Sequence, residues 1–126
     1  MSQQQLQQII QLLKSQPITG SPSVEETRAG FEKMAGMFPV DADVKSEPVN
    51  AGGVKSEWVT APGADPGRAV LYLHGGGYVI GSINTHRTLA GRISRAAKAR
   101  VLVIDYRLAP EHPFPAPVED CYAGLT

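Results

Sequence analysis

The sequence predicts an α/β fold built on a mostly parallel, doubly wound sheet. Two apolar runs without alternation, Ala69–Leu73 and Val101–Ile104, are typical of strands buried on both faces. The segment between them, about Thr85 to Ala99, carries an apolar face with helical spacing and is predicted to be a helix. Strand, helix and strand in succession form a βαβ unit, so we expect the two strands to be parallel.

Two short amphipathic helices are predicted before this unit. Ser2 and Gln5 match a capping box for the first, and Ser23 and Glu26 match one for the second. Pro17 and Pro39 are expected to end them. The apolar stripe of the first helix is Leu6, Ile9, Ile10 and Leu13, and that of the second is Phe31, Met34, Ala35 and Phe38. Neither helix can bury its stripe alone, so both need a larger body to lie on.

A strand hairpin is predicted next. Asp43–Val49 and Val54–Thr60 have strand character, and Asn50–Gly53 between them is a hairpin turn signal. In the second strand, alternation places Val54, Ser56 and Trp58 opposite Lys55, Glu57 and Val59. A second turn, Ala61–Gly67, then leads into the first buried strand. In the helix that follows, the predicted inner face consists of Leu89, Ile93, Ala96 and Ala97.

Composition excludes several classes of function. The chain has 126 residues, with 12 Lys and Arg balanced by 12 Asp and Glu. Zero net charge argues against a nucleic-acid or membrane-surface partner, because both are usually held by an excess of cations. The single cysteine, Cys121, rules out an internal disulfide and a Cys-ligated zinc cluster. No apolar run is long enough to span a membrane and no export signal is visible, so a cytoplasmic location is expected.

A glycine-rich loop, His74–Gly81, follows the first buried strand. Glycines at the carboxyl end of a parallel strand lie where α/β sheets bind ligands. Two phosphate-binding motifs fail here, because a dinucleotide fingerprint needs Gly where Ile80 stands and a P-loop needs Lys where Ser82 stands. The sequence His-Gly-Gly-Gly instead matches the oxyanion-hole loop of lipases and esterases. A donor preset around an oxyanion supplies about 3–4 kcal/mol of transition-state stabilisation.

A second motif follows the second buried strand. Asp105–Pro117 reads DYRLAPEHPFPAP, a proline-set loop in which the Ala109-Pro110 and Phe114-Pro115 bonds could each be cis. Together, the two motifs resemble the hormone-sensitive-lipase-like family of bacterial esterases over residues 69–120. The resemblance implies the α/β-hydrolase fold with an amino-terminal helical cap. It therefore predicts a cap segment at 1–42 and the first part of the hydrolase domain at 43–126.

The resemblance implies roles for individual residues. Gly76 and Gly77 are expected to be oxyanion-hole donors, and Gly75 to shape the turn. The residues expected to support the site are His74, whose ring would hold the loop, with Asp105, Tyr106 and Arg107. Substrate-pocket candidates are Tyr78, Phe31, Met34 and Phe38; for the last three, ordinary helix packing is an equal alternative.

The catalytic triad of this fold is expected to be missing from the chain. The nucleophilic serine stands in Gly-x-Ser-x-Gly, and no serine here has glycine two residues away on both sides. His74, His86 and His112 form no recognisable catalytic or metal-binding arrangement, and Cys121 is interpreted as buried filler. The chain is therefore expected to be the amino-terminal portion of a longer esterase and to be inactive alone. The strand at 69–73 would then lose a neighbour and expose an apolar edge that favours aggregation.

The function implied for the complete protein is carboxylic ester hydrolysis. The resemblance implies a serine acyl-enzyme acting on short to medium acyl esters, with a small-molecule ester as the partner and a homodimer as the assembly. No cofactor and no metal are expected. A non-catalytic small-molecule receptor is the alternative, because plant hormone receptors keep the same loop on the same scaffold. An independent non-catalytic module is a third hypothesis.

Overall fold

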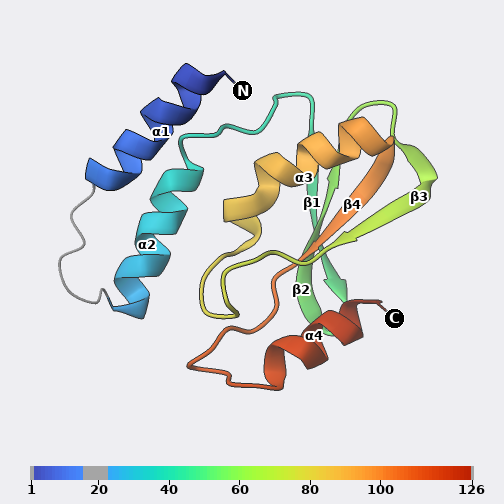
Figure 1. The fold of residues 1–126 in the computed structure, drawn as a ribbon. Helices are drawn as coiled ribbons and strands as arrows, with labels where there is room; N and C mark the ends of the chain where they lie inside the picture. The colour runs from blue at the N-terminus through green and yellow to red at the C-terminus, as the bar shows by residue number, and fades with distance from the viewer. Residues whose placement is uncertain (1, 16–22, 126) are drawn as a thin grey trace.

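The structure is a computed structural model that describes residues 2–15 and 23–125. Two helices, α1 (Gln3–Ser15) and α2 (Val24–Ala35), come first. Three strands follow, β1 (Lys45–Ala51), β2 (Val54–Thr60) and β3 (Asp65–Tyr72). The described chain then runs through α3 (Ile83–Ala97), β4 (Ala99–Ile104) and α4 (Ala116–Leu125) (Figure 1).

The strands form one sheet with the order β1-β2-β4-β3. β3 and β4 are connected through α3 and pair with each other in parallel, which confirms the predicted βαβ unit. β1 with β2 and β2 with β4 are antiparallel, so the described sheet is mixed. Side chains of β4 alternate between two apolar clusters. Val101 and Val103 pack on the α3 side, and Ile104 packs on the α4 side, so helices cover both faces as in a doubly wound fold.

The hairpin between β1 and β2 turns at Gly52 and Gly53, as predicted. Their φ angles are 62° and 93°, and the Asn50 side-chain oxygen accepts from the Gly53 N–H at 2.7 Å. Positive φ at both central positions matches the right-handed twist of the flanking strands. β1 begins at Lys45 and ends at Ala51, two residues later at each end than expected.

β3 differs from its prediction in two ways. It begins at Asp65, so the expected turn at Ala61–Gly67 is shorter, and the pairing with β4 shifts in register between Asp65 and Ala69. The prediction that this strand is buried on both faces is also wrong for the described chain, because residues 65–69 are exposed and residues 70–72 only half-buried. The reason is its place at the edge of the described sheet, with β4 as its one strand neighbour there.

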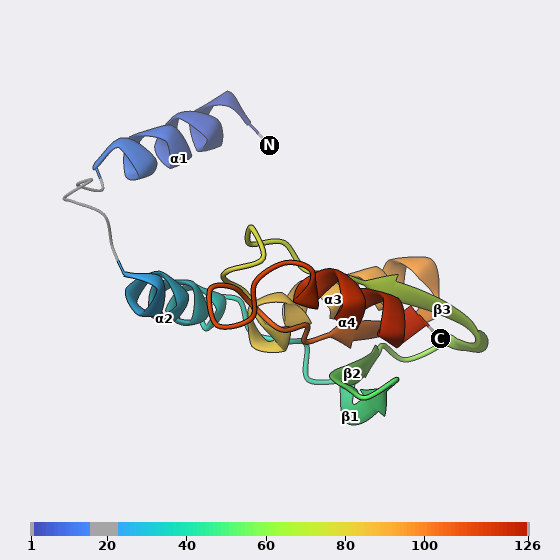
Figure 2. The same cartoon turned by 90° about the horizontal axis from the view of Figure 1, so that it is seen from below.

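α1 begins at the predicted capping box, where Ser2 and Gln5 exchange hydrogen bonds of 3.0 and 3.2 Å. Its stripe, however, remains largely open, with Leu13 63% exposed, and none of its residues is buried. Figure 2 shows α1 standing apart from the sheet, beyond α2. Pro17, expected to end this helix, lies outside the described residues.

α2 also begins as predicted, with the Ser23 hydroxyl accepting from the Glu26 N–H. It ends at Ala35 rather than before Pro39. Gly36 is its C-cap and donates to the Glu32 carbonyl, and the Met37 N–H donates to the Met34 carbonyl. Phe38 therefore lies beyond the helix. Its carbonyl accepts from the Thr88 hydroxyl of α3 at 2.5 Å.

α3 is rotated relative to its predicted inner face. The buried residues are Ile83, Ala90, Gly91 and Ser94, whereas Leu89 is 46% exposed and Ala96 is exposed. Small side chains let the helix approach its neighbours closely: a Cβ on Gly91 would meet Val44 at 3.4 Å, and the Ser94 hydroxyl donates to the Ala99 carbonyl. Of the predicted inner face, Ile93 does pack against the core, but Leu89 and Ala96 do not, and the small buried residues were missed. Among the residues that the structure describes, no helix is long and apolar enough to cross a membrane.

Candidate functional site

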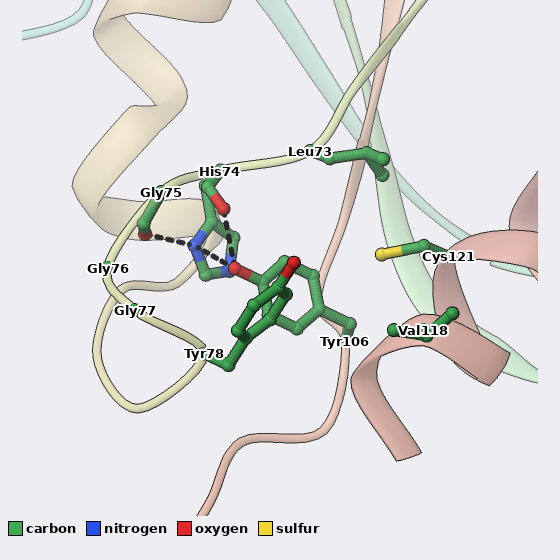
Figure 3. Close-up of a pocket in the computed structure, with 9 residues that line it drawn as sticks. All are labelled: Leu73, His74, Gly75, Gly76, Gly77, Tyr78, Tyr106, Val118 and Cys121. Carbon is green, nitrogen blue, oxygen red and sulfur yellow. Dashed lines mark hydrogen bonds between the residues drawn. The ribbon is translucent and has the colours of Figure 1, made fainter. Parts of the chain in front are cut away.

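The glycine-rich loop forms one wall of a cavity of about 380 Å³ at the carboxyl ends of β3 and β4. The loop after β3, the segment after β4 and the helix α4 line this cavity (Figure 3). Its lining residues are Leu73, His74, Gly75, Gly76, Gly77, Tyr78, Tyr106, Val118 and Cys121. A second cavity of about 310 Å³ shares Gly77, Tyr78 and Val118 with the first. The edge of the sheet where a ligand was expected is therefore hollow.

The three successive glycines are not equivalent. Gly76 and Gly77 have φ angles of 129° and 64°, whereas a Cβ on Gly75 would meet nothing within 4 Å and no positive φ is required there. A Cβ on Gly76 would lie 2.1 Å from the Ile80 carbonyl oxygen. Gly76 is thus required both by its backbone angle and by the close return of the loop.

Hydrogen bonds fix the orientation of two peptide groups in this loop. The Gly76 carbonyl accepts from the N–H groups of Val79 and Ile80 at 3.2 and 3.1 Å. The Gly75 carbonyl lies 2.9 Å from Nδ1 of His74. Because C=O and N–H point in opposite directions across a trans peptide, holding these carbonyls also aims the N–H groups of Gly77 and Gly76. Within the described chain, neither N–H donates to a protein acceptor, so both remain available to a ligand.

His74 is buried behind the loop. Its ring stacks on Tyr106 with a centroid distance of 4.3 Å and on His86 at 5.3 Å. The Tyr106 hydroxyl donates to the His74 carbonyl at 2.5 Å, and burial raises the pKa of Tyr106 to about 12, so this donor keeps its proton. Since the Gly75 carbonyl can only accept, His74 is assigned the tautomer with its proton on Nδ1. Nε2 is then a buried acceptor without a partner among the described residues.

The segment after β4 is tied to α4. The Arg107 guanidinium donates to both carboxylate oxygens of Asp120, and the Arg107 N–H donates to the same group at 2.8 Å. Burial alone would raise the pKa of Asp120, but these hydrogen bonds outweigh it and hold the pKa below its ordinary value. Asp105 is half-buried, and burial raises the pKa of its carboxyl. Asp120 was not among the sequence candidates, because its partner lies on another element.

Arg28 of α2 is the other residue that the sequence analysis missed. Its side chain reaches both loops of the site, donating to the carbonyls of Val79 and Ala109 and pairing with Glu111. The Arg28 hydrogen bond lowers the pKa of Glu111 to about 2. A single arginine on the polar face of an amphipathic helix carries no local signal that could have identified this role. In the proline-rich segment after β4, the Ala109-Pro110 and Phe114-Pro115 bonds are both cis.

The pocket candidates are only partly brought together. Tyr78 lines both cavities, with a φ of 63° that is uncommon for a residue with a side chain. Phe31 instead meets the edge of the His86 ring at 5.7 Å, and Phe38 lines a separate hollow between α2 and α3. Neither of those residues nor Met34 lines the two cavities at the glycine loop. Their role in substrate binding stays a prediction.

Cys121 lines the first cavity from α4 (Figure 3). Burial raises the pKa of its thiol, and the nearby Asp120 carboxylate acts in the same direction. The neutral thiol is therefore favoured, which does not suit a nucleophile. In the described ranges, no three His, Cys, Asp or Glu side chains are grouped to hold a metal ion.

Comparison with known proteins gives a consistent result. A family model described as the α/β hydrolase fold matches residues 70–126. An acetyl-hydrolase of Streptomyces hygroscopicus is 37% identical over 124 residues, which are 98% of this chain and 41% of that protein.

Solved structures are similar over nearly the whole chain. A crystal structure of an esterase from the bacterial hormone-sensitive lipase family superposes with a TM-score of 0.88 at 46% identity, covering 99% of this chain and 42% of that one. The esterase EstE5, soaked with p-nitrophenyl butyrate, gives a TM-score of 0.86 at 50% identity, covering 96% of this chain and 40% of that one. The chain thus spans about two fifths of the length of these proteins.

Proposed function

This chain belongs to the bacterial hormone-sensitive lipase family of α/β hydrolases, and from that membership we propose that the protein is a carboxylic ester hydrolase. The proposed reaction proceeds through a serine acyl-enzyme on short to medium acyl esters. The relative soaked with p-nitrophenyl butyrate supports an ester of short acyl chain as substrate. A nucleophile elbow is absent from the printed sequence, so the serine would come from a part of the protein outside these 126 residues.

The residues of this chain would stabilise the oxyanion. The observation that carries this proposal is the pair of N–H groups, on Gly76 and Gly77, whose orientation is fixed and which have no protein acceptor in the described chain. When the serine attacks the ester carbonyl, its oxygen gains negative charge, and these two donors would hold it. Gly75 would shape the turn, and His74 and Tyr106 would hold the loop from behind.

The same proposal covers the domain boundaries, the substrate pocket and the residues that support the site. We assign residues 1–42 to a helical cap and residues 43–126 to the first part of the hydrolase domain. Tyr78, Phe31, Met34 and Phe38 are proposed to line the pocket for the ester, and Asp105 and Arg107 to support the loop after β4. A homodimer of the complete protein and a cytoplasmic location stay predictions.

Kinetics of glycine variants test the proposal. In the complete protein, the Gly76→Ala variant should lower kcat for p-nitrophenyl butyrate by about 10²–10³-fold, as expected when one oxyanion contact is lost. The added Cβ would collide with the Ile80 carbonyl and shift the loop. The matched Gly75→Ala variant adds the same methyl group in open space, so its loss should be much smaller.

Several results would contradict the proposal. A complete protein that binds but never hydrolyses p-nitrophenyl esters would favour the small-molecule receptor. Equal losses in the two glycine variants would mean that Gly76 has no special role. Turnover by the 126-residue chain alone would show that the nucleophile is not supplied from elsewhere.

A further inference from the structure

Arg28 connects α2 to both loops of the candidate site. Its Nε donates to the Val79 carbonyl at 2.8 Å, and its Nη2 donates to the Ala109 carbonyl at 2.9 Å. The same guanidinium forms a two-pronged pair with Glu111, at 2.5 and 3.0 Å. These partners lie on the end of the glycine loop and on the proline-rich segment after β4. One side chain therefore joins three separate parts of the chain.

The two loops are also joined directly at this point. The Ala109 N–H donates to the Tyr78 carbonyl at 2.8 Å, so the peptide groups on either side of Ala109 are both engaged. Arg28 spans the next pair of carbonyls, those of Val79 and Ala109. The guanidinium and the backbone hydrogen bond together fix the distance between the two loops.

Val79 transmits this restraint to the oxyanion donors. Its N–H donates to the Gly76 carbonyl, and its own carbonyl accepts from Arg28. The Gly76 carbonyl belongs to the same rigid peptide group as the Gly77 N–H. A shift of Val79 would therefore tilt the peptide group that aims one of the two proposed donors.

The rest of the α2 face supports the same region. Glu32 accepts from the Ser82 hydroxyl at 2.5 Å, and Phe31 meets the ring of His86. Residues 28, 31 and 32 are spaced to lie on one side of a helix. Their contacts fall on the end of the glycine loop and on the first turns of α3, so α2 packs along the back of the loop.

We propose that Arg28 is a positioning residue for the oxyanion hole, clamping α2 onto the glycine loop and the proline-rich segment. This inference rests on the function proposed above. The two carbonyl hydrogen bonds do the positioning, and Glu111, whose side chain is 54% exposed, orients the guanidinium. Since the oxyanion exists only in the transition state, loss of the clamp should lower kcat far more than it changes KM.

Steady-state kinetics of three variants of the complete protein test this. Arg28→Met keeps the apolar stem but removes the donors, and kcat for p-nitrophenyl butyrate should fall about 10- to 100-fold, as expected for a small misplacement of catalytic groups. KM should stay within about twofold, since ground-state binding is unaffected. Arg28→Lys should recover part of the loss, because an ammonium can reach one carbonyl but not both. Lys33→Met, on the same helix and exposed, is the matched control.

Hydrogen exchange of the loop amides gives a second readout that does not need activity. The amides of residues 77–81 should exchange faster in Arg28→Met than in the parent protein or in Lys33→Met, while the strand amides of β4 remain unchanged. If the parent protein hydrolyses no ester, the proposed function fails, and faster exchange confined to this loop would still support the clamp.

Three outcomes would overturn the clamp. Parental kcat and parental loop exchange in Arg28→Met would show that the contacts do not restrain the loop. A raised KM with unchanged kcat would place Arg28 in substrate binding instead. Faster exchange throughout the sheet would show a general loss of stability.

Discussion

His86 is the titratable side chain directly behind the glycine loop, between His74 and Phe31. Its ring stacks on His74 at 5.3 Å, and it is half-buried. Burial lowers the pKa of His86 below 6.5, and the neighbouring His74 acts in the same direction. The folded protein therefore favours neutral His86, whereas the unfolded chain takes up a proton near the ordinary pKa.

A pH dependence of stability follows from this shift. As pH falls through about 6.5, the unfolded state gains a proton that the folded state resists, so the free energy of unfolding should decrease. For one proton the slope cannot exceed about 1.4 kcal/mol per pH unit. Urea unfolding at pH 7.5 and 5.5 should show a smaller decrease in His86→Gln than in the parent protein. The control is His112→Gln, at an exposed position; a full decrease in His86→Gln would contradict the assignment.

The three glycines of the loop differ in how strictly their positions require glycine. The motif presents Gly75, Gly76 and Gly77 alike, but only Gly76 has both a positive φ and no room for a Cβ. That difference arises because the loop folds back at Ile80, whose carbonyl oxygen occupies the space that a Cβ on Gly76 would need. It is set by the path of the loop and not by any property of a single glycine.

At the scale of elements, α3 is attached to β2 by an ion pair between Arg87 and Glu57. Nε and Nη2 of Arg87 donate to the two carboxylate oxygens at 2.6 and 2.9 Å. The Glu57 side chain is 8% exposed and that of Arg87 is 27% exposed. The Arg87 hydrogen bond lowers the pKa of Glu57 and outweighs the opposing effect of burial.

Removal of the arginine should therefore destabilise the protein. Arg87→Met leaves a nearly buried carboxylate without its partner, and we expect the free energy of unfolding to fall by about 2–4 kcal/mol at pH 7. Arg92→Met, on the exposed side of the same helix, should change it by less than about 0.5 kcal/mol.

The pH dependence of this difference provides a further check on the same pair. Because the folded pKa of Glu57 is lowered from 4.5, its contribution is present above that pH and is lost as pH falls through the folded pKa. The gap between parent and Arg87→Met in urea unfolding should therefore narrow in acid. A constant gap would assign the loss to packing of the arginine stem.

At the scale of the whole molecule, the described chain leaves apolar surface open, and its sheet has two edge strands, β1 and β3. β3 pairs with β4 alone there, and Leu73 beside it is 46% exposed. The chain also spans only about two fifths of the related esterases. An open edge strand offers unpaired N–H and C=O groups to another copy.

The 126-residue chain on its own is therefore expected to self-associate. Light scattering should show a mass that increases with concentration, and Ala69→Lys, which places a charge on exposed β3, should reduce this increase. Ala96→Lys adds the same charge on the exposed side of α3, away from the strand edge, and should have less effect. Equal effects of the two lysines would attribute the change to net charge alone.

Local features were predictable because their interacting residues are close in the sequence. The caps at Ser2 and Ser23 join residues three positions apart, and the turn at Gly52 and Gly53 depends on the φ angles of two adjacent residues. The parallel pairing of β3 and β4 also followed from the pattern, since a helix between two apolar strands leaves one favourable connection. The position of the glycine loop after β3 followed in turn.

Contacts between distant segments decided the rest. Arg28 meets Val79 and Ala109 across 51 and 81 positions, and the buried face of α3 is chosen by how closely Gly91 and Ser94 let the helix approach. Such choices depend on which surfaces meet, and a local pattern of apolar and polar residues does not contain that information. The motifs thus predict an oxyanion loop and indicate the family, whereas packing between elements determines that Gly76 has no room for a Cβ and that Arg28 spans the two loops.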